Sequence, residues 1–596
     1  MGDERSRAAR KDRYAAVIDQ EKVTDEVRDV ALKYDPLNRS GRQEGFHVTA
    51  DGELHIDDDR VIEEHRIVEH RIPNDAIKIV RLPAERGRLV HQYGQNGFRL
   101  YGLPTPVEGR VVGLLGPNGV GKSTALRVLA GLLKPNLGAS DGAEWDAIVR
   151  AFRGTGVQRY LEDLRDGDLR AAYKPQRVDR LPGRYEGTVG DLLEARDERG
   201  SRATAVERLE LGGLLGRRTD ELSGGELQRV AIAATLVADA DAYLLDEPSS
   251  YLDVGQRLTV ARALSPLAGA RRVLVVDHDL VTLDVACDDV DVVYGDPGGF
   301  GVVSRPLSAR RGINQFLTGY LRSENVRIRE DAVDFLRRPG RRVSDEEPVV
   351  EFSPLAASFP SFSLRTEAGA VRRGEVLGIF GRNGLGKTTF AKLLAGAIEP
   401  DDGEVAGDVR VSYKPQHVEP SYDGTIRELF EEAVGDRGRA FETGVRRPFD
   451  LEPLLDRDVG RLSGGELQRV GVALALARRA DMYLLDEPSA YLDVDGRTSL
   501  ATHLRAFVEE GAPCLVIDHD LLLLHYVSDR AMVFEGTPGE RGIARSPESV
   551  RRGTNRFLKT VDVTFRRDPN TGRPRANDPG SRKDREQKRS GDYYVA

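Results

Sequence analysis

The sequence predicts an α/β fold in which two related domains stand in tandem behind a small α+β domain. The first observation is a repeat: Leu222–Val230 and Leu462–Val470 both read LSGGELQRV, 240 residues apart. The second is that a glycine-rich loop lies upstream of each copy, between an apolar run and a helical pattern. A repeat of this length indicates a duplicated domain and not a solenoid of short units.

The two glycine-rich loops have the pattern of phosphate-binding loops. Residues 116–123 read GPNGVGKS and residues 381–388 read GRNGLGKT, so both match G-x-x-x-x-G-K-[ST] in a strand–loop–helix context. Backbone N–H groups of such a loop surround phosphate oxygens, the lysine reaches the β- and γ-phosphates, and the hydroxyl binds Mg²⁺. A chance glycine-rich turn does not explain two loops at matched positions. The expected nucleotide contacts are Gly116, Asn118, Gly119, Gly121, Lys122, Ser123 and Thr124, and in the second copy Gly381, Asn383, Gly384, Gly386, Lys387, Thr388 and Thr389.

Further polar residues recur where apolar strands end. Each of two strands, 242–245 and 482–485, runs into an Asp-Glu pair, which would place the aspartate beside the metal and the glutamate beside the attacking water. Solvated acids at a strand end are the simpler alternative for either pair alone. A histidine follows another strand in each copy and suits γ-phosphate sensing, and a glutamine in each Tyr-Lys-Pro-Gln segment suits metal and water contact. These expectations concern Asp246, Glu247, His278 and Gln176 in the first copy, and Asp486, Glu487, His519 and Gln416 in the second.

Aromatic residues precede each loop and are candidates to stack on adenine. They are Tyr93 and Phe98 in the first copy and Phe359 or Phe362 in the second. Ordinary core packing is the alternative for each ring.

This combination resembles the ATP-binding-cassette (ABC) ATPases, a family of P-loop proteins that hydrolyse ATP with Mg²⁺. The resemblance implies that the Ser-Gly-Gly motif of one domain closes over the nucleotide held by the other domain's loop. It therefore assigns Ser463, Gly464 and Gly465 to the first site and Ser223, Gly224 and Gly225 to the second. It also makes Asp253 and Asp493 inter-domain contacts.

Composition excludes several classes of protein. The chain has 596 residues, a net charge of −9 and only two cysteines, Cys287 and Cys514, which rules out a disulfide framework and suits a reducing cytosol. It has no apolar run of the roughly 18 residues that a membrane span needs, and its charged N-terminus is unlike a signal peptide. We therefore expect a cytoplasmic protein with no membrane segment.

The domain boundaries follow from composition and from the repeat. We expect a disordered basic arm at 1–13, a small domain at 14–82, nucleotide-binding domains at 83–300 and 346–545, a hinge at 301–345, a second hinge element at 546–565 and a disordered tail at 566–596. Four histidines fall in the small domain, His47, His55, His65 and His70. Their spacing matches no zinc pattern, so we interpret them as scattered surface residues.

Two features lie outside the repeated catalytic pattern. Between the loop lysine and the glutamine the first copy is 25 residues longer than the second, and this insertion, at about 137–170, reads as a helix–loop–helix. It is either a partner surface or a hairpin packed on its own domain. Basic segments at Arg310–Leu317, Arg551–Leu558 and 321–345 indicate hinges with an RNA-facing surface, with an ordinary solvated surface as the alternative.

These features together resemble ABC subfamily E, the ribosome-recycling ATPases also called RNase L inhibitor. Its marks here are the twin LSGGELQR motifs, the segments Arg81–Pro83 and Leu103–Pro106, the insertion and the two hinges. The resemblance implies a monomer that splits ribosomes by ATP-driven closure of its two halves. The implied partners are the small ribosomal subunit with its RNA and a termination or initiation factor. A ribosome-binding anti-association factor without splitting activity, or a soluble ATPase with another partner, remain alternatives.

The chain departs from that family in its small domain. Family members have a ferredoxin-like domain whose two [4Fe–4S] clusters are bound by eight cysteines. Here residues 1–286 contain no cysteine, and Ile62, His65, Val68 and Ile72 stand near the places where four would be. We therefore expect a ferredoxin-like domain held together by apolar packing, without an iron–sulfur cluster.

Overall fold

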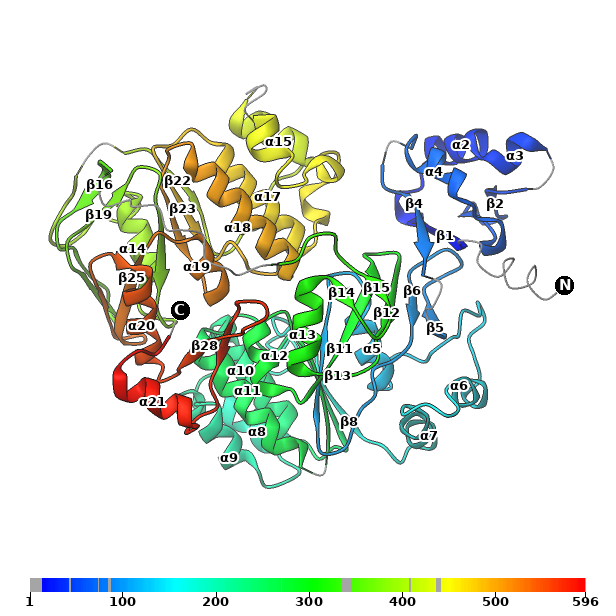
Figure 1. Ribbon diagram of the computed structural model, residues 1–596, viewed down its shortest axis with the longest axis horizontal. Coiled ribbons are helices and arrows are strands. Elements are labelled where there is room, and N and C mark those ends of the chain that lie inside the picture. Colours follow the sequence, from blue (N-terminus) through cyan, green and yellow to red (C-terminus); the bar gives the residue numbers. More distant parts are fainter. Residues whose placement is uncertain are drawn as a thin grey trace.

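The computed structural model of the protein describes residues 13–41, 44–72, 74–83, 87–269, 271–333, 346–406, 409–435 and 441–594. Most of the expected arm, and the hinge from residue 334 to 345, lie outside these ranges. Figure 1 shows a small N-terminal domain beside the first of two larger halves, with the chain's C-terminal segment lying between the halves. Among the described residues, no helix combines the length and apolarity that crossing a membrane requires.

The small domain is built on an antiparallel pair, β1 and β4, with a second short pair, β2 and β3. Its core is apolar and includes Val27, Phe46, Leu54, Val68 and Ile79. Alternation along β1 and β4 turns one side chain in two toward this core. The elements are β1 (Arg13–Ile18), α2 (Asp25–Tyr34), α3 (Pro36–Ser40), β2 (His47–Val48), β3 (Leu54–His55), α4 (Arg66–Glu69) and β4 (Ile77–Leu82).

Two of the four histidines in this domain are not surface residues, so that interpretation was wrong for them. His65 is fully buried, with its Nε2 3.4 Å from Oδ1 of Asp35, which is also fully buried. His55 is buried as well and contacts Asn96 and Glu53. Sequence spacing could not show this, because the loops that bury both rings are distant in the chain.

The first half is a mixed sheet with strand order β5-β6-β12-β11-β7-β10-β9-β8, and β13 pairs with β11. The central strands β7, β10 and β9 are parallel and apolar, as strands covered on both faces must be, and β8 adds a further parallel strand at the edge. Its strands are β5 (Leu89–Gln92), β6 (Arg99–Tyr101), β7 (Val111–Leu115), β8 (Ala171–Lys174), β9 (Ala242–Asp246), β10 (Arg272–Val276), β11 (Asp289–Asp296), β12 (Phe300–Val303) and β13 (Leu307–Ser308). Its helices are α5 (Lys122–Leu129), α6 (Trp145–Ala151), α7 (Gln158–Asp166), α8 (Val189–Arg196), α9 (Arg202–Arg208), α10 (Gly224–Leu236), α11 (Val254–Ala268), α12 (Leu280–Ala286) and α13 (Ala309–Thr318).

The second half repeats this sheet as β17-β18-β26-β25-β20-β24-β23-β22, with β27 on β25, so the tandem α/β fold is confirmed. A separate small sheet holds β19, β16 and β21. The strands are β16 (Pro348–Phe352), β17 (Ala356–Ser358), β18 (Ser363–Thr366), β19 (Gly369–Arg372), β20 (Val376–Phe380), β21 (Val405–Ala406), β22 (Val411–Lys414), β23 (Met482–Asp486), β24 (Cys514–Ile517), β25 (Arg530–Thr537), β26 (Arg541–Ala544) and β27 (Glu548–Ser549). The helices are α14 (Lys387–Leu394), α15 (Ile426–Val434), α17 (Gly464–Ala477), α18 (Val494–Glu509), α19 (Leu521–Val527) and α20 (Val550–Thr560).

The insertion in the first half forms the two helices α6 and α7, at the edge of the molecule in Figure 1. Its inner side packs on the first half through Ile148, Phe152, Tyr160 and Leu161, all buried. Arg150, Arg153 and Arg159 are exposed on the same two helices and their loop. The hairpin therefore packs on its own domain and also exposes these arginines, together with the acidic Asp146 and Asp166.

The expected disordered tail at 566–596 is instead ordered as far as residue 594, where the described residues end, which corrects the prediction. The chain forms β28 (Phe565–Arg567), β29 (Pro574–Ala576) and α21 (Arg582–Ser590). Arg573 is fully buried, with its guanidinium 3.1 Å from Asp284 of α12, and Arg575 donates to the same carboxylate at 2.6 Å. The polar composition predicted disorder, but two arginines of this segment form ion pairs with Asp284 of the first half.

The tail also contacts the hinge helix α13. The Asp568 carboxylate accepts hydrogen bonds from Arg310 at 3.0 Å and from Asn314 at 3.1 Å. Arg310 thus has a protein partner, which it would have to keep or exchange to contact RNA. Its neighbour Arg311 is exposed.

Candidate functional site

The phosphate-binding loops join β7 to α5 and β20 to α14. Gly121 and Gly386 have φ values of 86° and 85°, a left-handed conformation that favours glycine. A Cβ at Gly121 would stand 2.6 Å from the ring of Phe98, and one at Gly386 would stand 2.7 Å from the ring of Phe362. Each loop is therefore braced from behind by an aromatic ring.

The lysine of each loop is buried and curls over the loop. Lys122 Nζ donates to the carbonyl oxygens of Gly116 at 2.8 Å and Pro117 at 2.6 Å, and Lys387 makes the equivalent bonds to Gly381 and Arg382. Burial lowers the pKa of Lys122 to about 8. Phosphate oxygens are stronger acceptors than carbonyl oxygens because they are charged. A bound nucleotide would therefore replace these carbonyls as the partner of the lysine amine.

A hydroxyl and a carboxylate meet beside each loop. Thr388 Oγ1 donates to Asp486 Oδ2 at 2.7 Å, and in the first half Ser123 lies close to Asp246 and acts to lower its pKa. Oδ1 of Asp246 is buried and, within the described part of the chain, has no hydrogen-bond partner. A buried, unpaired carboxylate oxygen beside a hydroxyl is the oxygen donor set that Mg²⁺ prefers. The residues present fit Mg²⁺ here.

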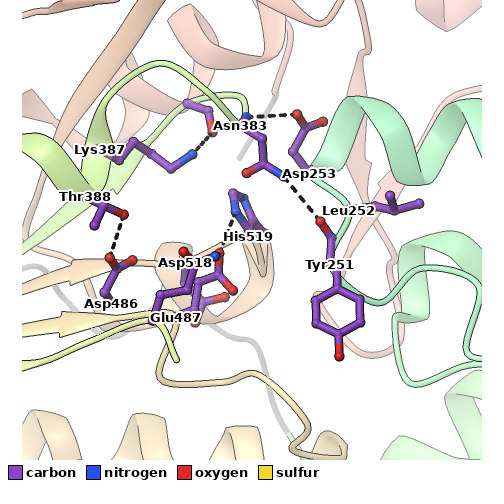
Figure 2. Close-up of polar contacts among 12 residues, drawn as sticks. Tyr251, Leu252, Asp253, Asn383, Lys387, Thr388, Asp486, Glu487, Asp518 and His519 are labelled. Atoms are coloured by element: carbon purple, nitrogen blue, oxygen red, sulfur yellow. Dashed lines mark hydrogen bonds and ion pairs between the residues drawn. The ribbon is translucent and has the colours of Figure 1, made fainter. Parts of the chain in front are cut away.

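In each half a glutamate, a glutamine and a histidine converge. Gln176 Nε2 donates to Glu247 Oε1, and Gln416 donates to Glu487 Oε1, both at 2.7 Å. The histidine approaches the same oxygen: His278 Nε2 is 3.7 Å from Glu247 Oε1 and His519 Nε2 is 3.1 Å from Glu487 Oε1. Figure 2 shows Glu487 and His519 beside the second loop.

Each loop is also contacted by the opposite half. The Asn118 N–H donates to Asp493 at 2.8 Å, and the Asn383 N–H donates to Asp253 at 3.0 Å (Figure 2). The asparagine side chains donate to the carbonyl oxygens of Tyr491 and Tyr251, and the two tyrosine hydroxyls meet at 2.8 Å. One cavity between the halves is lined by both glutamates and both histidines. Both sites therefore face a single interface between the halves, which is the arrangement that the family resemblance implied.

The Ser-Gly-Gly motifs lie at the N-termini of α10 and α17. Ser223 and Ser463 cap these helices, with each side chain accepting from the N–H of the glutamate three residues on. A Cβ at Gly225 would stand 3.8 Å from Nδ2 of Asn383, so the first motif adjoins the second loop. Gly464 and Gly465 lie against Tyr491, whose carbonyl contacts the first loop.

In each half, one of the two aromatic candidates is packed behind the loop and the other is partly exposed. Phe98 and Phe362 brace the loops, whereas Tyr93 and Phe359 are 39% and 41% exposed. The Tyr93 hydroxyl lies 3.3 Å from Thr124 Oγ1, just after the loop. The partly exposed rings are therefore the ones with a face available to adenine.

Sequence reasoning missed three pairs of residues in these sites, although all three lie in repeated segments. Lys174 and Lys414 are the lysines of Tyr-Lys-Pro-Gln, and Gln228 and Gln468 belong to LSGGELQR. All four donate to backbone carbonyls of the Asp-Glu pairs. Tyr173 and Tyr413 donate to the aspartates. Occurrence in both copies was the available signal.

The small domain does not offer the ligands of an iron–sulfur cluster. Clusters need thiolates, and both cysteines lie in the larger halves. Val68, at one expected ligand position, is fully buried in the apolar core, and His65 contacts Asp35. Within the described ranges, no three His, Cys, Asp or Glu side chains are grouped as a metal site requires.

Comparison with known proteins agrees with this geometry. The ABC transporter family matches residues 105–250 and 365–490. An uncharacterized ABC transporter ATP-binding protein of Methanocaldococcus jannaschii is 48% identical over 530 residues, 88% of each chain. The translation initiation factor RLI1 of Saccharomyces cerevisiae is 44% identical over 546 residues, also 88% of each.

Solved structures agree too. A structure of RNase-L Inhibitor has 49% identity and a TM-score of 0.79, over 85% of this chain and 99% of that one. The chain in a structure described as ribosome-bound archaeal Pelota and ABCE1 has 46% identity and a TM-score of 0.92, over 98% of this chain and 100% of that one. With relatives this similar along most of its length, the chain belongs to the E family of ABC ATPases.

Proposed function

We propose that this chain is a cytoplasmic twin-site ATPase that acts on ribosomes, with closure of its halves coupled to subunit dissociation or to initiation. The observation that carries the proposal is the match over 98% of the chain, at a TM-score of 0.92, to a protein solved in a ribosome-bound state with Pelota. Another similar protein, 50% identical, was solved with an archaeal ribosomal stalk protein. Relatives named as translation initiation factors support the same assignment.

The proposed mechanism gives each residue one task. Lys122 and Lys387 neutralise phosphate charge, and the hydroxyls of Ser123 and Thr388 hold Mg²⁺ together with the aspartates and glutamines. Bound Mg²⁺ would neutralise charge on the β- and γ-phosphates. Glu247 and Glu487 orient the attacking water and accept its proton. The tasks of the remaining residues follow from their position: His278 and His519 contact the γ-phosphate, Tyr93 and Phe359 stack on adenine, and Ser463–Gly465 and Ser223–Gly225 close the sites from the opposite half.

The catalytic assignment is tested by Glu247→Gln combined with Glu487→Gln. Loss of the water-positioning base commonly costs about 10²–10⁴ in rate. Turnover should fall by that factor, while equilibrium binding of a fluorescent ATP analogue stays within about threefold. Undiminished turnover in the double variant would show that these carboxylates are not the bases.

The ribosome-binding surface is proposed to include the outer side of α6 and α7. Its exposed arginines suit phosphate contacts, which make affinity fall steeply with salt. We expect Arg153→Glu with Arg159→Glu to weaken cosedimentation with small subunits and to flatten its salt dependence. The matched control is Arg196→Glu with Arg208→Glu, which reverses two exposed charges on α8 and α9 of the same half. Equal pelleting of both variants would remove this surface from the proposal.

A second candidate function has one specific observation in its favour. That observation is the absence of cluster ligands in the small domain. If family members need a domain made rigid by iron–sulfur clusters to separate ribosomal subunits, this chain would bind the ribosome without splitting it. It would then act as an anti-association factor. We propose that the purified protein contains no stoichiometric iron, and anaerobic purification with iron and sulfide analysis checks this. A splitting assay with ATP and with a non-hydrolysable analogue separates the two functions, because only a splitting enzyme needs turnover for repeated cycles.

A further inference from the structure

The two proposed catalytic glutamates have an unusual backbone. Glu247 has a φ of 47° and Glu487 a φ of 48°, in the left-handed region that side chains with a Cβ rarely adopt. This conformation costs roughly 1–2 kcal/mol for such a residue and persists only where the surroundings hold it. Both residues directly follow the last residue of a buried strand, β9 or β23, so the chain must turn sharply there while aiming the carboxylate at the interface.

The same donors hold this turn in both halves. Lys174 Nζ donates to the carbonyl oxygens of Asp246 at 2.9 Å and Glu247 at 3.2 Å. Lys414 Nζ donates to Asp486 at 2.8 Å and Glu487 at 3.1 Å. An adjacent glutamine, Gln228 or Gln468, donates to the same glutamate carbonyl.

The lysines are costly in these positions. Lys174 is 0% exposed and Lys414 1%, and each hydrogen bond recorded for their ammonium groups ends on a main-chain carbonyl. Removing an ammonium group from water costs several kcal/mol, and attraction to the carboxylates of the Asp-Glu pair offsets only part of this cost, since burial still lowers the pKa of both lysines. An apolar side chain would fill the space at lower cost, so two buried lysines on the same two carbonyls indicate a task that methionine or leucine could not perform.

We propose that Lys174 and Lys414 are positioning residues for ATP hydrolysis, each holding the main chain of the Asp-Glu turn so that the glutamate carboxylate meets the attacking water. The inference rests on the proposed role of Glu247 and Glu487 as bases. In this arrangement the glutamine of Tyr-Lys-Pro-Gln fixes the carboxylate from the front, with its 2.7 Å bond, and the lysine two residues earlier fixes its backbone from behind. One segment therefore controls both ends of the same residue.

The test is a chain with Lys174→Met and Lys414→Met, which keeps the volume and removes the donors. A misplacement of about 1 Å at a reacting group can cost about 10²-fold. We expect kcat to fall about 10- to 100-fold, with the Kd for a fluorescent ATP analogue within about threefold of the parent. The matched control is Lys33→Met, an exposed lysine of the N-terminal domain, which should match the parent in both values.

A purely structural role is separated by combining variants. If the lysines act through the glutamates, the methionine changes should cause no further loss of turnover in a chain that already carries Glu247→Gln and Glu487→Gln, because residues that act as a unit are not additive. A further independent loss, or a parallel rise in the Kd, would overturn the inference. Thermal unfolding of each variant accompanies these measurements.

A second variant covers the case in which the methionine chain does not fold. Gln228→Leu with Gln468→Leu removes the other donor from the same carbonyls and should give the same split between kcat and Kd. Parental kcat in a folded chain of either kind would sink the inference. If instead the Glu→Gln chain keeps full turnover, the failure lies with the proposed bases and not with the lysines.

Discussion

The two halves have the same catalytic framework but differ at the histidine. The glutamine–glutamate distance is 2.7 Å in both, whereas the histidine–glutamate distance is 3.7 Å in the first half and 3.1 Å in the second. Burial alone would raise the pKa of Glu487, but the hydrogen bond and charge of His519, with nearby lysine charges, lower it to about 2. Neither ring nitrogen of His278 has a hydrogen-bond partner among the residues that the structure describes.

Burial is the main cause of the weak attraction at His278, because it lowers the pKa of this histidine well below its usual value. The charges of Lys122, in the same half, and of Arg497, on α18 of the second half, lower this pKa further. A histidine with so low a pKa is neutral, so its attraction for the glutamate is weak. The two halves thus have identical motifs but differ in the electrostatics around the histidine.

The halves also differ where the C-terminal segment crosses them. Asp284 of α12 and His525 of α19 are both the fifth residues of corresponding helices. The segment binds the first with Arg573 and Arg575 and packs Tyr594 edge-on against the second, with ring centroids 5.1 Å apart. Figure 1 shows the segment between the halves. The C-terminal segment therefore binds the first half through ion pairs and contacts the second half through an aromatic pair.

The largest expected effect comes from inactivating one ATP site at a time, which tests whether the two sites turn over at different rates. Glu247→Gln or Glu487→Gln alone should silence its own site by about 10²–10⁴, leaving the turnover of the other. Steady-state hydrolysis of the two single variants then gives the share of each half. Equal residual rates would show that the histidine geometry does not affect turnover.

The next effect concerns the C-terminal segment. Asp284→Ala leaves Arg573 buried without its main partner and should cost about 3–5 kcal/mol of unfolding free energy. His525→Ala removes an aromatic contact worth about 0.5–1.5 kcal/mol. Urea unfolding of both variants measures the ratio. Similar losses of unfolding free energy in the two variants would mean that the buried ion pair does not stabilise the segment more than the aromatic contact does.

The pH dependence of stability should sharpen the difference at the glutamates. The pKa of Glu487 is depressed from 4.5 to about 2 in the folded nucleotide-free chain. Its contribution is therefore complete above about pH 4.5 and disappears as the pH falls toward 2. The shift corresponds to on the order of 3 kcal/mol. Comparing urea unfolding at pH 6 and pH 3, the parent should lose more stability than Glu487→Gln does, and His519→Ala should fall between them.

The smallest effect tests the contact at the centre of the interface. Tyr251→Phe removes the hydroxyl that meets Tyr491 at 2.8 Å, a bond worth about 0.5–1.5 kcal/mol. The equilibrium constant for closure of the two halves should fall by up to about tenfold. Energy transfer between labels on the two halves, at a saturating concentration of an ATP analogue, measures this constant. Tyr491→Phe should match it, because the two hydroxyls share one bond.

The sequence by itself determined the fold class and the segments that come together at the two sites. Phosphate loops, Asp-Glu pairs and Ser-Gly-Gly caps depend on residues close together in the chain, so their patterns are readable without a structure. The resemblance also implied which half covers which loop, and the contacts of Asn118 with Asp493 and of Asn383 with Asp253 connect the halves in that way.

Only the tertiary structure decided which charges are solvated. The tail reads as disordered because arginine and lysine are rarely buried, yet Arg573 is buried against a carboxylate 289 residues away in the chain. His65 and Lys174 are hidden in the same way, by Asp35 in one case and by the carbonyls of a turn in the other. Burial of a polar group is stable only when a specific partner is present, and local sequence does not encode where a distant partner lies.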